Sequence, residues 1–348
     1  RLVGSEMCIR DRHNIKQHTR KQKRGVFKVR RSEYRQQEKK AFPWVKVLLS
    51  LILIITLLIA GIFLYLFLKV KSTADTMTDE ETVNYTSEKR EKKVDLKKKE
   101  PISVVLFGTD SDAVRESKGS GARTDTIIVA TINPNKDKTT MVSIPRDTQA
   151  KLADVGSVEK INHAYAYGGP TTAMKTVENL LDIPIDFYAT VNMDGFTTVI
   201  DKIGGIDVTS PNTFSMGGYS FVEGETYHMD GKEALAFSRS RKQAGSGGDF
   251  GRQNRQQLVV ESIMKNLVSI NSASNINGIL DTFGSNVITN ASFNDLTKLQ
   301  SYSGALDNIE RDALEGSGGI QGDGLWYFVP SQQSVNNVSN KARENLEL

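Results

Sequence analysis

Residues 123–147 read RTDTIIVATINPNKDKTTMVSIPRD, and this stretch decides what kind of fold the chain can form. Two β-branched runs, 125–133 and 138–144, flank the polar segment NPNKD, whose composition is typical of a tight turn. We therefore expect the two runs to be neighbouring antiparallel strands. An earlier run at 102–107, ISVVLF, is closed by Gly108 and predicts a third, buried strand.

Helical patterns alternate with strand patterns along the rest of the chain. Apolar residues recur at helical spacing over 171–181 and 250–270, and a strand pattern lies at 187–191. Asp194 and Asp230 are candidate N-caps. Further helices are expected at 195–203, 230–236 and 294–306, and further strands at 206–208 and 325–329. This alternation predicts an α/β fold: a three-layer α/β/α sandwich on a mixed central sheet, in one domain over residues 101–348.

The net charge of +4 hides a strong asymmetry along the chain. Residues 13–46 carry 12 basic and 2 acidic side chains, residues 47–68 carry none, and residues 69–100 carry 9 basic and 8 acidic. Residues 101–348 carry 21 basic and 29 acidic side chains, which disfavours a globular DNA-binding domain. We interpret these segments as a basic tail, one transmembrane helix, a solvated charged stalk and a folded body.

The uncharged segment Val47–Leu68 is long enough to span a bilayer, about 33 Å at ~1.5 Å per residue. Trp44 and Tyr65 stand near its ends, where aromatic rings favour the membrane interface. Lys69 follows in place of a small-residue cleavage site, so an uncleaved anchor is favoured over a signal peptide.

The flanking charges predict the topology. The basic residues before the span place the N-terminus in the cytoplasm and residues 101–348 outside the cell. Residues 21–31, KQKRGVFKVRR, could also be interpreted as a nucleic-acid arm, but a topogenic or anionic-lipid role needs fewer assumptions. We therefore expect a membrane-lipid partner and no nucleic acid.

Residues 1–12, RLVGSEMCIRDR, resemble a translated sequencing-adapter scar, and we leave them out of the fold. They contain Cys8, the single cysteine of the sequence, so no disulfide framework is possible. With four His in all, a structural zinc site is not expected either.

Arginines gather in one part of the body. Four of its nine arginines fall within 17 residues, at Arg239, Arg241, Arg252 and Arg255. The last two share a helix face with Gln256 near the start of the expected helix, where free N–H groups also favour anions. On a strand, the first two would share a face. Convergent guanidinium groups indicate phosphate or pyrophosphate, and the alternative is a salt-bridged surface helix with Asp249 as partner.

Charged triplets also stand at the ends of three expected strands: Gly108-Thr-Asp110, Arg123-Thr-Asp125 and Pro145-Arg-Asp147. Strand ends are where ligand sites form in open α/β sheets. Carboxylates placed there suit a hard cation such as Mg²⁺, which takes one or two carboxylates together with phosphate oxygens.

Taken together, the motifs are specific. They are GTD (108–110), RTDTI (123–127), SIPRDT (143–148), KINHAYAYGGP (160–170), DGF (194–196) with GGIDV (204–208), LAFSRSRK (235–242) and GDFGRQNRQQ (248–257). In this order behind a membrane anchor, the set resembles the LytR-CpsA-Psr family of Gram-positive cell-envelope proteins, over about residues 102–270. The resemblance implies transfer of a phosphate-linked glycopolymer, such as wall teichoic acid or capsule, from a polyprenyl-pyrophosphate carrier to peptidoglycan. It also implies Mg²⁺ (or Mn²⁺) as cofactor and an apolar pocket for the polyprenyl tail.

The resemblance carries roles to individual residues. Asp125, assisted by Asp110, matches the metal position. The catalytic set is Asp110, Asp125, Arg123 and Arg146. The pyrophosphate set is Arg123, Arg146, Arg239, Arg241, Arg252 and Gln256, with Arg255 added from the shared helix face.

The general base stays open among Asp110, Asp147 and Asp249, whereas Lys160, His163 and Tyr165 are as compatible with structural roles. Two other functions use the same residues. One is a non-catalytic or regulatory envelope protein that binds anionic polymer, and the other is a polyprenyl-pyrophosphate hydrolase.

Overall fold

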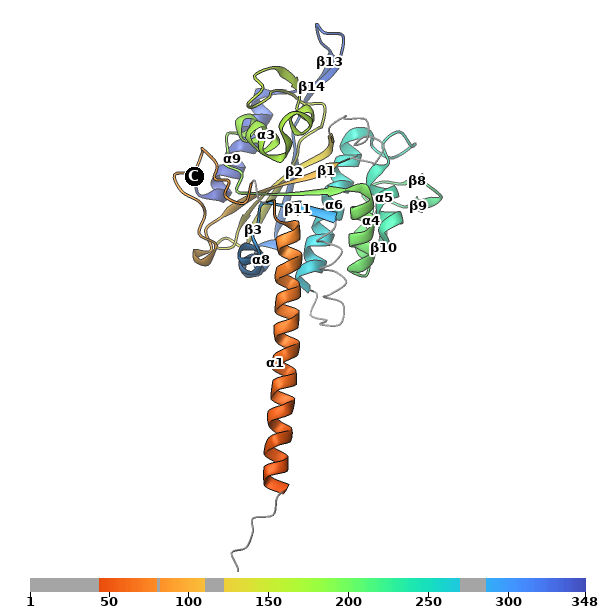
Figure 1. Cartoon of the computed structure of the whole chain (residues 1–348). Coiled ribbons are helices and arrows are strands. Elements are labelled where there is room, and N and C mark those ends of the chain that lie inside the picture. The colour runs from red at the N-terminus through yellow and green to blue at the C-terminus, as the bar shows by residue number, and fades with distance from the viewer. Residues whose placement is uncertain (1–43, 80–81, 110–121, 270–285) are drawn as a thin grey trace, which may run out of the picture. The chain divides into compact units, whose positions relative to one another are not determined.

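The computed structural model describes residues 44–79, 82–109, 122–269 and 286–348 (Figure 1). The expected apolar helix is present as α1 (Trp44–Met77), which continues beyond the uncharged segment. Its stretch Ile52–Lys69 is long and apolar enough to cross a membrane. Its side chains that the structure describes between Ile52 and Leu68 are exposed, as expected for a surface made to face lipid.

The centre of the folded unit is a six-stranded mixed sheet in the order β11-β6-β1-β2-β3-β12. Its strands are β1 (Ile102–Thr109), β2 (Thr124–Asn133), β3 (Lys138–Ser143), β6 (Phe187–Asn192), β11 (Val287–Thr289) and β12 (Ile309–Ala313). The pair β2–β3 is antiparallel, as the turn composition predicted, and β1–β2 is antiparallel as well, whereas β6 joins β1 and β12 joins β3 in parallel.

The register of this sheet brings the ends of β1, β3 and β6 and the start of β2 to one edge. Thr109 pairs with Thr124 and also with Asn192, and Ser143 pairs with Ile128. The end of β1, the start of β2 and the end of β3 therefore lie together. The described residues of the charged triplets expected at strand ends thus lie at the same edge of the sheet.

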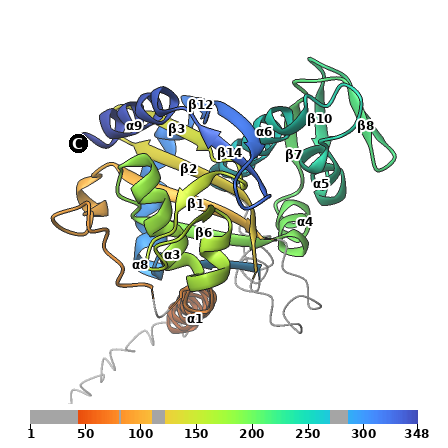
Figure 2. The same cartoon turned by 90° about the horizontal axis from the view of Figure 1, so that it is seen from above.

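Helices cover both faces of the sheet (Figures 1 and 2). On one face, alternate residues such as Val105 and Ile127 pack in a core with residues of α3 (His163–Leu181) and α9 (Gln332–Leu346). On the other face, Ile128 packs with apolar residues of α6 (Gly248–Ser269). This arrangement confirms the predicted three-layer α/β/α fold.

A second apolar cluster supports the start of α6. It is built around aromatic side chains including Phe214, Phe221 and Phe237, whose ring centroids lie 4.9 to 5.8 Å apart. Asp230 is the N-cap of helix α5 (Gly231–Arg239), as predicted. Helix α4 (Met193–Lys202) is capped by Asn192 and not by Asp194. The elements of this cluster are α4 (Met193–Lys202), β7 (Ile206–Thr209), β8 (Phe214–Met216), β9 (Tyr219–Phe221), β10 (Thr226–Met229) and α5 (Gly231–Arg239).

The remaining elements are short. The helix expected at 294–306 is split into α8 and the 3-10 helix η2, and the strand expected at 325–329 is β14, which pairs with β13 outside the central sheet. The bounds are η1 (Leu96–Lys98), β4 (Gln149–Lys151), β5 (Val158–Lys160), α8 (Phe293–Leu299), η2 (Gln300–Leu306), β13 (Gly316–Ile320) and β14 (Trp326–Pro330).

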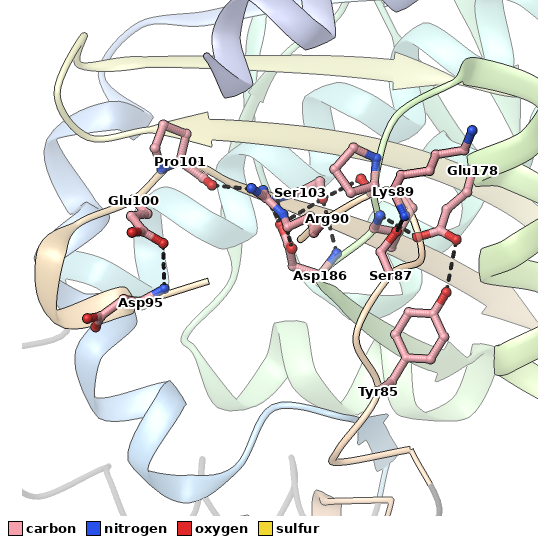
Figure 3. A network of polar contacts seen from close by, with 12 residues as sticks. Tyr85, Ser87, Lys89, Arg90, Asp95, Glu100, Pro101, Ser103, Glu178 and Asp186 are labelled. Atoms are coloured by element: carbon pink, nitrogen blue, oxygen red, sulfur yellow. Dashed lines mark hydrogen bonds and ion pairs between the residues drawn. The ribbon is translucent and has the colours of Figure 1, made fainter. Parts of the chain in front are cut away.

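Residues 82–100 differ from the expected solvated stalk, because they pack against the folded unit (Figure 3). Arg90 forms a bidentate ion pair with Asp186, at 2.6 and 2.8 Å, and the same carboxylate accepts the Ser103 N–H and hydroxyl. Tyr85 donates to Glu178 at 2.9 Å, and burial followed by the Glu178 charge raises the pKa of the Tyr85 hydroxyl. Composition misled because polar contacts join a few buried apolar ones, in which Val94 and Leu96 pack with Ile102.

Asp186→Asn is expected to lower the free energy of unfolding by about 3–5 kcal/mol, because Arg90 is then left buried without its counter-charge. Urea denaturation followed by circular dichroism measures the change. The matched control is Lys89→Met, which breaks the exposed pair with Asp182 and should change stability by less than about 1 kcal/mol. Equal, small effects of both variants would contradict a structural role for residues 82–100.

Candidate functional site

An apolar cavity of about 320 Å³ lies between the central sheet and helices α4, α5 and α6. One face of α6 contributes Gln256, Val259, Val260, Ile263, Met264 and Leu267. This spacing is that of a single helix face, so the cavity follows α6 for about 16 Å, at ~1.5 Å per residue. The walls are made by β1, β2 and β6 and by Phe196 and Leu235. Such a shape fits an elongated apolar ligand.

A polar cavity of about 300 Å³ adjoins it. The two cavities share five lining residues, Asp125, Thr126, Met193, Arg239 and Gln256. The polar cavity adds Arg241, Lys242, Gln243 and Arg252. The site therefore consists of an apolar cavity joined to a cationic one, and Asp125 lines both.

Asp125 is held by Arg146, whose guanidinium lies 2.5 Å from the carboxylate. Burial lowers the pKa of Arg146, but the hydrogen bond and charge of Asp125, with Asp147 and Asp249 behind them, raise it overall. Asp147 in turn lies 3.6 Å from Arg146 and 2.9 Å from Lys160. The end of β3 thus places a chain of alternating charges beside the start of β2.

Asp249 forms ion pairs with two further arginines, Arg241 and Arg252. Its carboxylate lies 3.1 Å from Arg241 and 2.5 Å from Arg252, and it accepts a hydrogen bond from Gln253 at 2.9 Å. Burial lowers the pKa of Arg252, and the charges of Arg241 and Arg146 lower it further against the effect of Asp249. The polar cavity is lined by four cationic side chains, Arg239, Arg241, Lys242 and Arg252, and by one carboxylate, Asp125, so positive charge is in excess there.

The structure brings together most of the residues predicted from sequence, namely Asp125, Arg146, Arg239, Arg241, Arg252 and Gln256. Arg239 ends α5 and Arg241 follows it in a loop, so the expectation that they share a strand face is wrong, although both line the polar cavity. Lys242 and Gln243 were not predicted, and their position beside Arg241 in the sequence was the signal for them.

Two predicted residues lie elsewhere, and a third is not among the described residues. Arg123 is exposed outside both cavities, and its charge acts on Tyr167. Arg255 is 0% exposed and does not line either cavity. Asp110 falls outside the described residues.

The candidate bases and the KINHAYAYGGP residues also have defined partners. Asp147 and Asp249 are each held by two cationic side chains, which is unfavourable for a proton acceptor. His163 pairs with Glu159 at 2.9 Å, and Tyr165 packs edge-on against Phe107 in the core. These contacts favour structural roles for His163 and Tyr165.

The charge pattern bears on a metal. In the described part of the chain no group of three or more His, Cys, Asp or Glu side chains is placed to hold one. Mg²⁺ does not need such a group when a ligand brings phosphate oxygens, because one or two carboxylates then suffice. Asp125, lining both cavities, fits that requirement.

Comparison with known proteins agrees with this geometry. A model of the LytR_cpsA_psr family matches residues 64–344. The chain is 40% identical over 295 residues to the polyisoprenyl-teichoic acid–peptidoglycan teichoic acid transferase TagU of Halalkalibacterium halodurans, covering 84% of this chain and 95% of that protein. It is 39% identical over 302 residues to TagU of Bacillus subtilis, covering 86% and 96%. A solved structure of TagT bound to LIIa-WTA matches with a TM-score of 0.63 and 30% identity, covering 76% of this chain and 98% of that one.

The chain therefore belongs to the LytR-CpsA-Psr family, as its motifs indicated, and the match extends on both sides of residues 102–270. Relatives at about 40% identity in this family are named as transferases, which confirms the class of enzyme expected from the sequence.

Asp249→Asn is expected to lower the melting temperature, because Arg241 and Arg252 then repel each other without a shared counter-charge. Added inorganic pyrophosphate should restore more stability to this variant than to the unmodified chain, since the anion replaces the missing carboxylate. Thermal unfolding with and without pyrophosphate measures both effects. Glu261→Gln, which removes an acid further along the same helix, should show no such restoration.

Proposed function

We propose that this protein transfers a phosphate-linked glycopolymer of the teichoic-acid type from a polyprenyl-pyrophosphate carrier to peptidoglycan. The observation that carries the proposal is the junction of the apolar cavity with the arginine-lined polar cavity. A polyprenyl pyrophosphate has the same two-part chemistry, a long apolar tail and a compact polyanionic head. The named relatives transfer polyisoprenyl-linked teichoic acid to peptidoglycan.

The polar residues divide the work of holding the diphosphate. Arg239, Arg241 and Arg252 offer planar donor forks that match phosphate oxygens, and Gln256 adds an amide at the mouth of the apolar channel. Their shared excess of positive charge is reduced when the anion arrives. Phosphoryl transfer depends mainly on such positioning and charge neutralisation, so no nucleotide-binding loop is required.

Asp125 is the residue that would hold Mg²⁺, with Asp110, which lies outside the described residues, as its assistant. The metal would supply further neutralisation of the phosphate oxygens. Arg146 orients the Asp125 carboxylate, because its guanidinium pairs with it directly.

The reaction replaces one phosphorus–oxygen bond with another. A peptidoglycan hydroxyl attacks the sugar-side phosphorus, the bond from that phosphorus to the bridging oxygen breaks, and polyprenyl phosphate leaves with the electron pair. The hydroxyl proton must pass to a base. Asp147 and Asp249 each pair with two cationic side chains. Of the three candidate bases, this leaves Asp110, which lies outside the described residues.

The same proposal sets the location. The apolar segment of α1 would anchor the chain in the cell membrane as a single pass. The basic residues 13–46 favour a cytoplasmic N-terminus, which places the transferase unit outside the cell beside its acceptor. Lipid is then a partner in two ways: membrane lipids surround the anchor helix, and a polyprenyl lipid carries the donor.

Asp125→Ala tests the catalytic assignment. With purified lipid-linked donor and Mg²⁺, we expect turnover to fall by about 10²- to 10³-fold, because charge stabilisation of the pyrophosphate is lost. Donor binding should be partly retained, since the arginines remain. Asp207→Asn, at an exposed carboxylate on β7, should keep full turnover. Unchanged turnover of Asp125→Ala would refute a metal role for this residue.

Product analysis tests the acceptor. With peptidoglycan present, the released chain should be recovered covalently attached to peptidoglycan, together with polyprenyl phosphate. Recovery of free phosphorylated polymer at the same rate with and without peptidoglycan would instead identify a hydrolase. Donor binding without any cleavage would identify a non-catalytic polymer-binding protein.

A further inference from the structure

Arg255 occupies a position that neither the sequence pattern nor the proposed chemistry explains. It is the largest of the fully buried side chains in the described part of the chain. Its guanidinium stacks on Phe214, with its central carbon 4.5 Å from the ring centroid, and also lies 5.8 Å from that of Phe237. It is one helical turn from Arg252, which lines the polar cavity, yet it points into the protein.

The charge of Arg255 is satisfied by neutral oxygens. It donates to the carbonyl oxygens of Phe237 at 2.8 Å and Ser246 at 2.6 Å, and to the carbonyl oxygen of Ser240. Among the described residues, no acidic side chain is in ion-pair contact with it. Burial, and then the charge of Arg252, lower its pKa to about 10. A buried cation without a counter-charge is a poor source of stability, so its geometry needs another reason.

The three carbonyl groups belong to the two ends of one loop. We define residues 239–247 as the arginine loop, because they carry Arg239, the last residue of α5, and Arg241, which lies between α5 and α6. Phe237 lies in the last turn of α5, Ser240 is the C-cap of that helix, and Ser246 is near the far end of the loop. One rigid guanidinium fork therefore fixes where the loop leaves α5 and where it reaches α6.

Hydrogen bonds within the arginine loop also fix the conformation of its interior. The Gln243 side-chain oxygen accepts hydrogen bonds from the N–H groups of Arg241 and Lys242 and from the Ser240 hydroxyl. Gly245 has φ +77°, and a Cβ there would lie 2.1 Å from the Thr213 carbonyl oxygen. These contacts restrict the conformations that the loop can adopt.

We propose that Arg255 is a positioning residue that holds the arginine loop in the shape needed to present Arg239 and Arg241 to a pyrophosphate, without touching that ligand itself. The identity of the ligand rests on the proposed function, whereas the clamp on the loop does not. Lysine cannot replace Arg255, because a single ammonium group cannot reach carbonyl groups at both ends of the loop in a fixed plane.

The first test measures the loop without any ligand. In hydrogen-exchange mass spectrometry of the full chain in detergent, Arg255→Lys should speed exchange of the amides in residues 240–247 by at least about 10-fold. Exchange in β1, β2 and β3 should be unchanged. Arg90→Lys, a matched change at a buried ion pair in residues 82–100, should lower the melting temperature and leave the loop amides unchanged. Unchanged loop exchange in Arg255→Lys would overturn the clamp.

The second test measures coupling, with farnesyl pyrophosphate as the probe. Arg255→Lys and Arg241→Ala should each weaken binding by about 10-fold, and the double variant by little more than either alone, because Arg255 acts through the loop arginines. Fully additive losses would overturn the proposal by indicating separate contacts. Arg90→Lys should bind the probe normally. Failure of the unmodified chain to bind it would reject the proposed function, while the exchange experiment would still decide the clamp.

Discussion

Mutual repulsion between guanidinium groups is the constraint around which this site is built. Burial lowers the pKa of Arg252, the charge of Asp249 opposes that effect, and the charges of Arg241 and Arg146 lower the pKa further. Asp125, Asp147 and Asp249 pair with these arginines, while Arg239 and Lys242 add further positive charge to the polar cavity. In the proposed function a polyanion would relieve this repulsion, and that is the physical reason for assigning a diphosphate ligand to the site.

The fold supplies the rigidity that such a cluster requires. Antiparallel pairing of β2 with both neighbours brings Asp125 and Arg146 to one edge of the sheet, although 20 residues separate them in the sequence. The start of α6 brings Arg252 and Asp249 to the same place. Because α6 also lines the apolar cavity along one face, the same helix contributes to both the polar and the apolar cavity.

Sequence reasoning succeeded where the information is local. The strands at 102–107, 125–133 and 138–144 follow from apolar runs and a turn, and the shared orientation of Arg252 and Gln256 follows from helical spacing. The opposite orientation of Arg255 could not be predicted, because it depends on carbonyl groups that only the folded loop brings together. Arg239 and Arg241 were found by motif despite a wrong secondary structure.

The segment 82–100 shows a related limit of composition. A charged, weakly apolar sequence predicts solvation on the premise that burial is driven by apolar area. Here Arg90 and Asp186 satisfy each other, and the same carboxylate binds Ser103 at the start of β1. β1 ends at Thr109, in the wall of the apolar cavity. Residues 82–100 therefore fix the start of β1, and the end of β1 forms part of the cavity wall. The folded domain thus begins before its first strand.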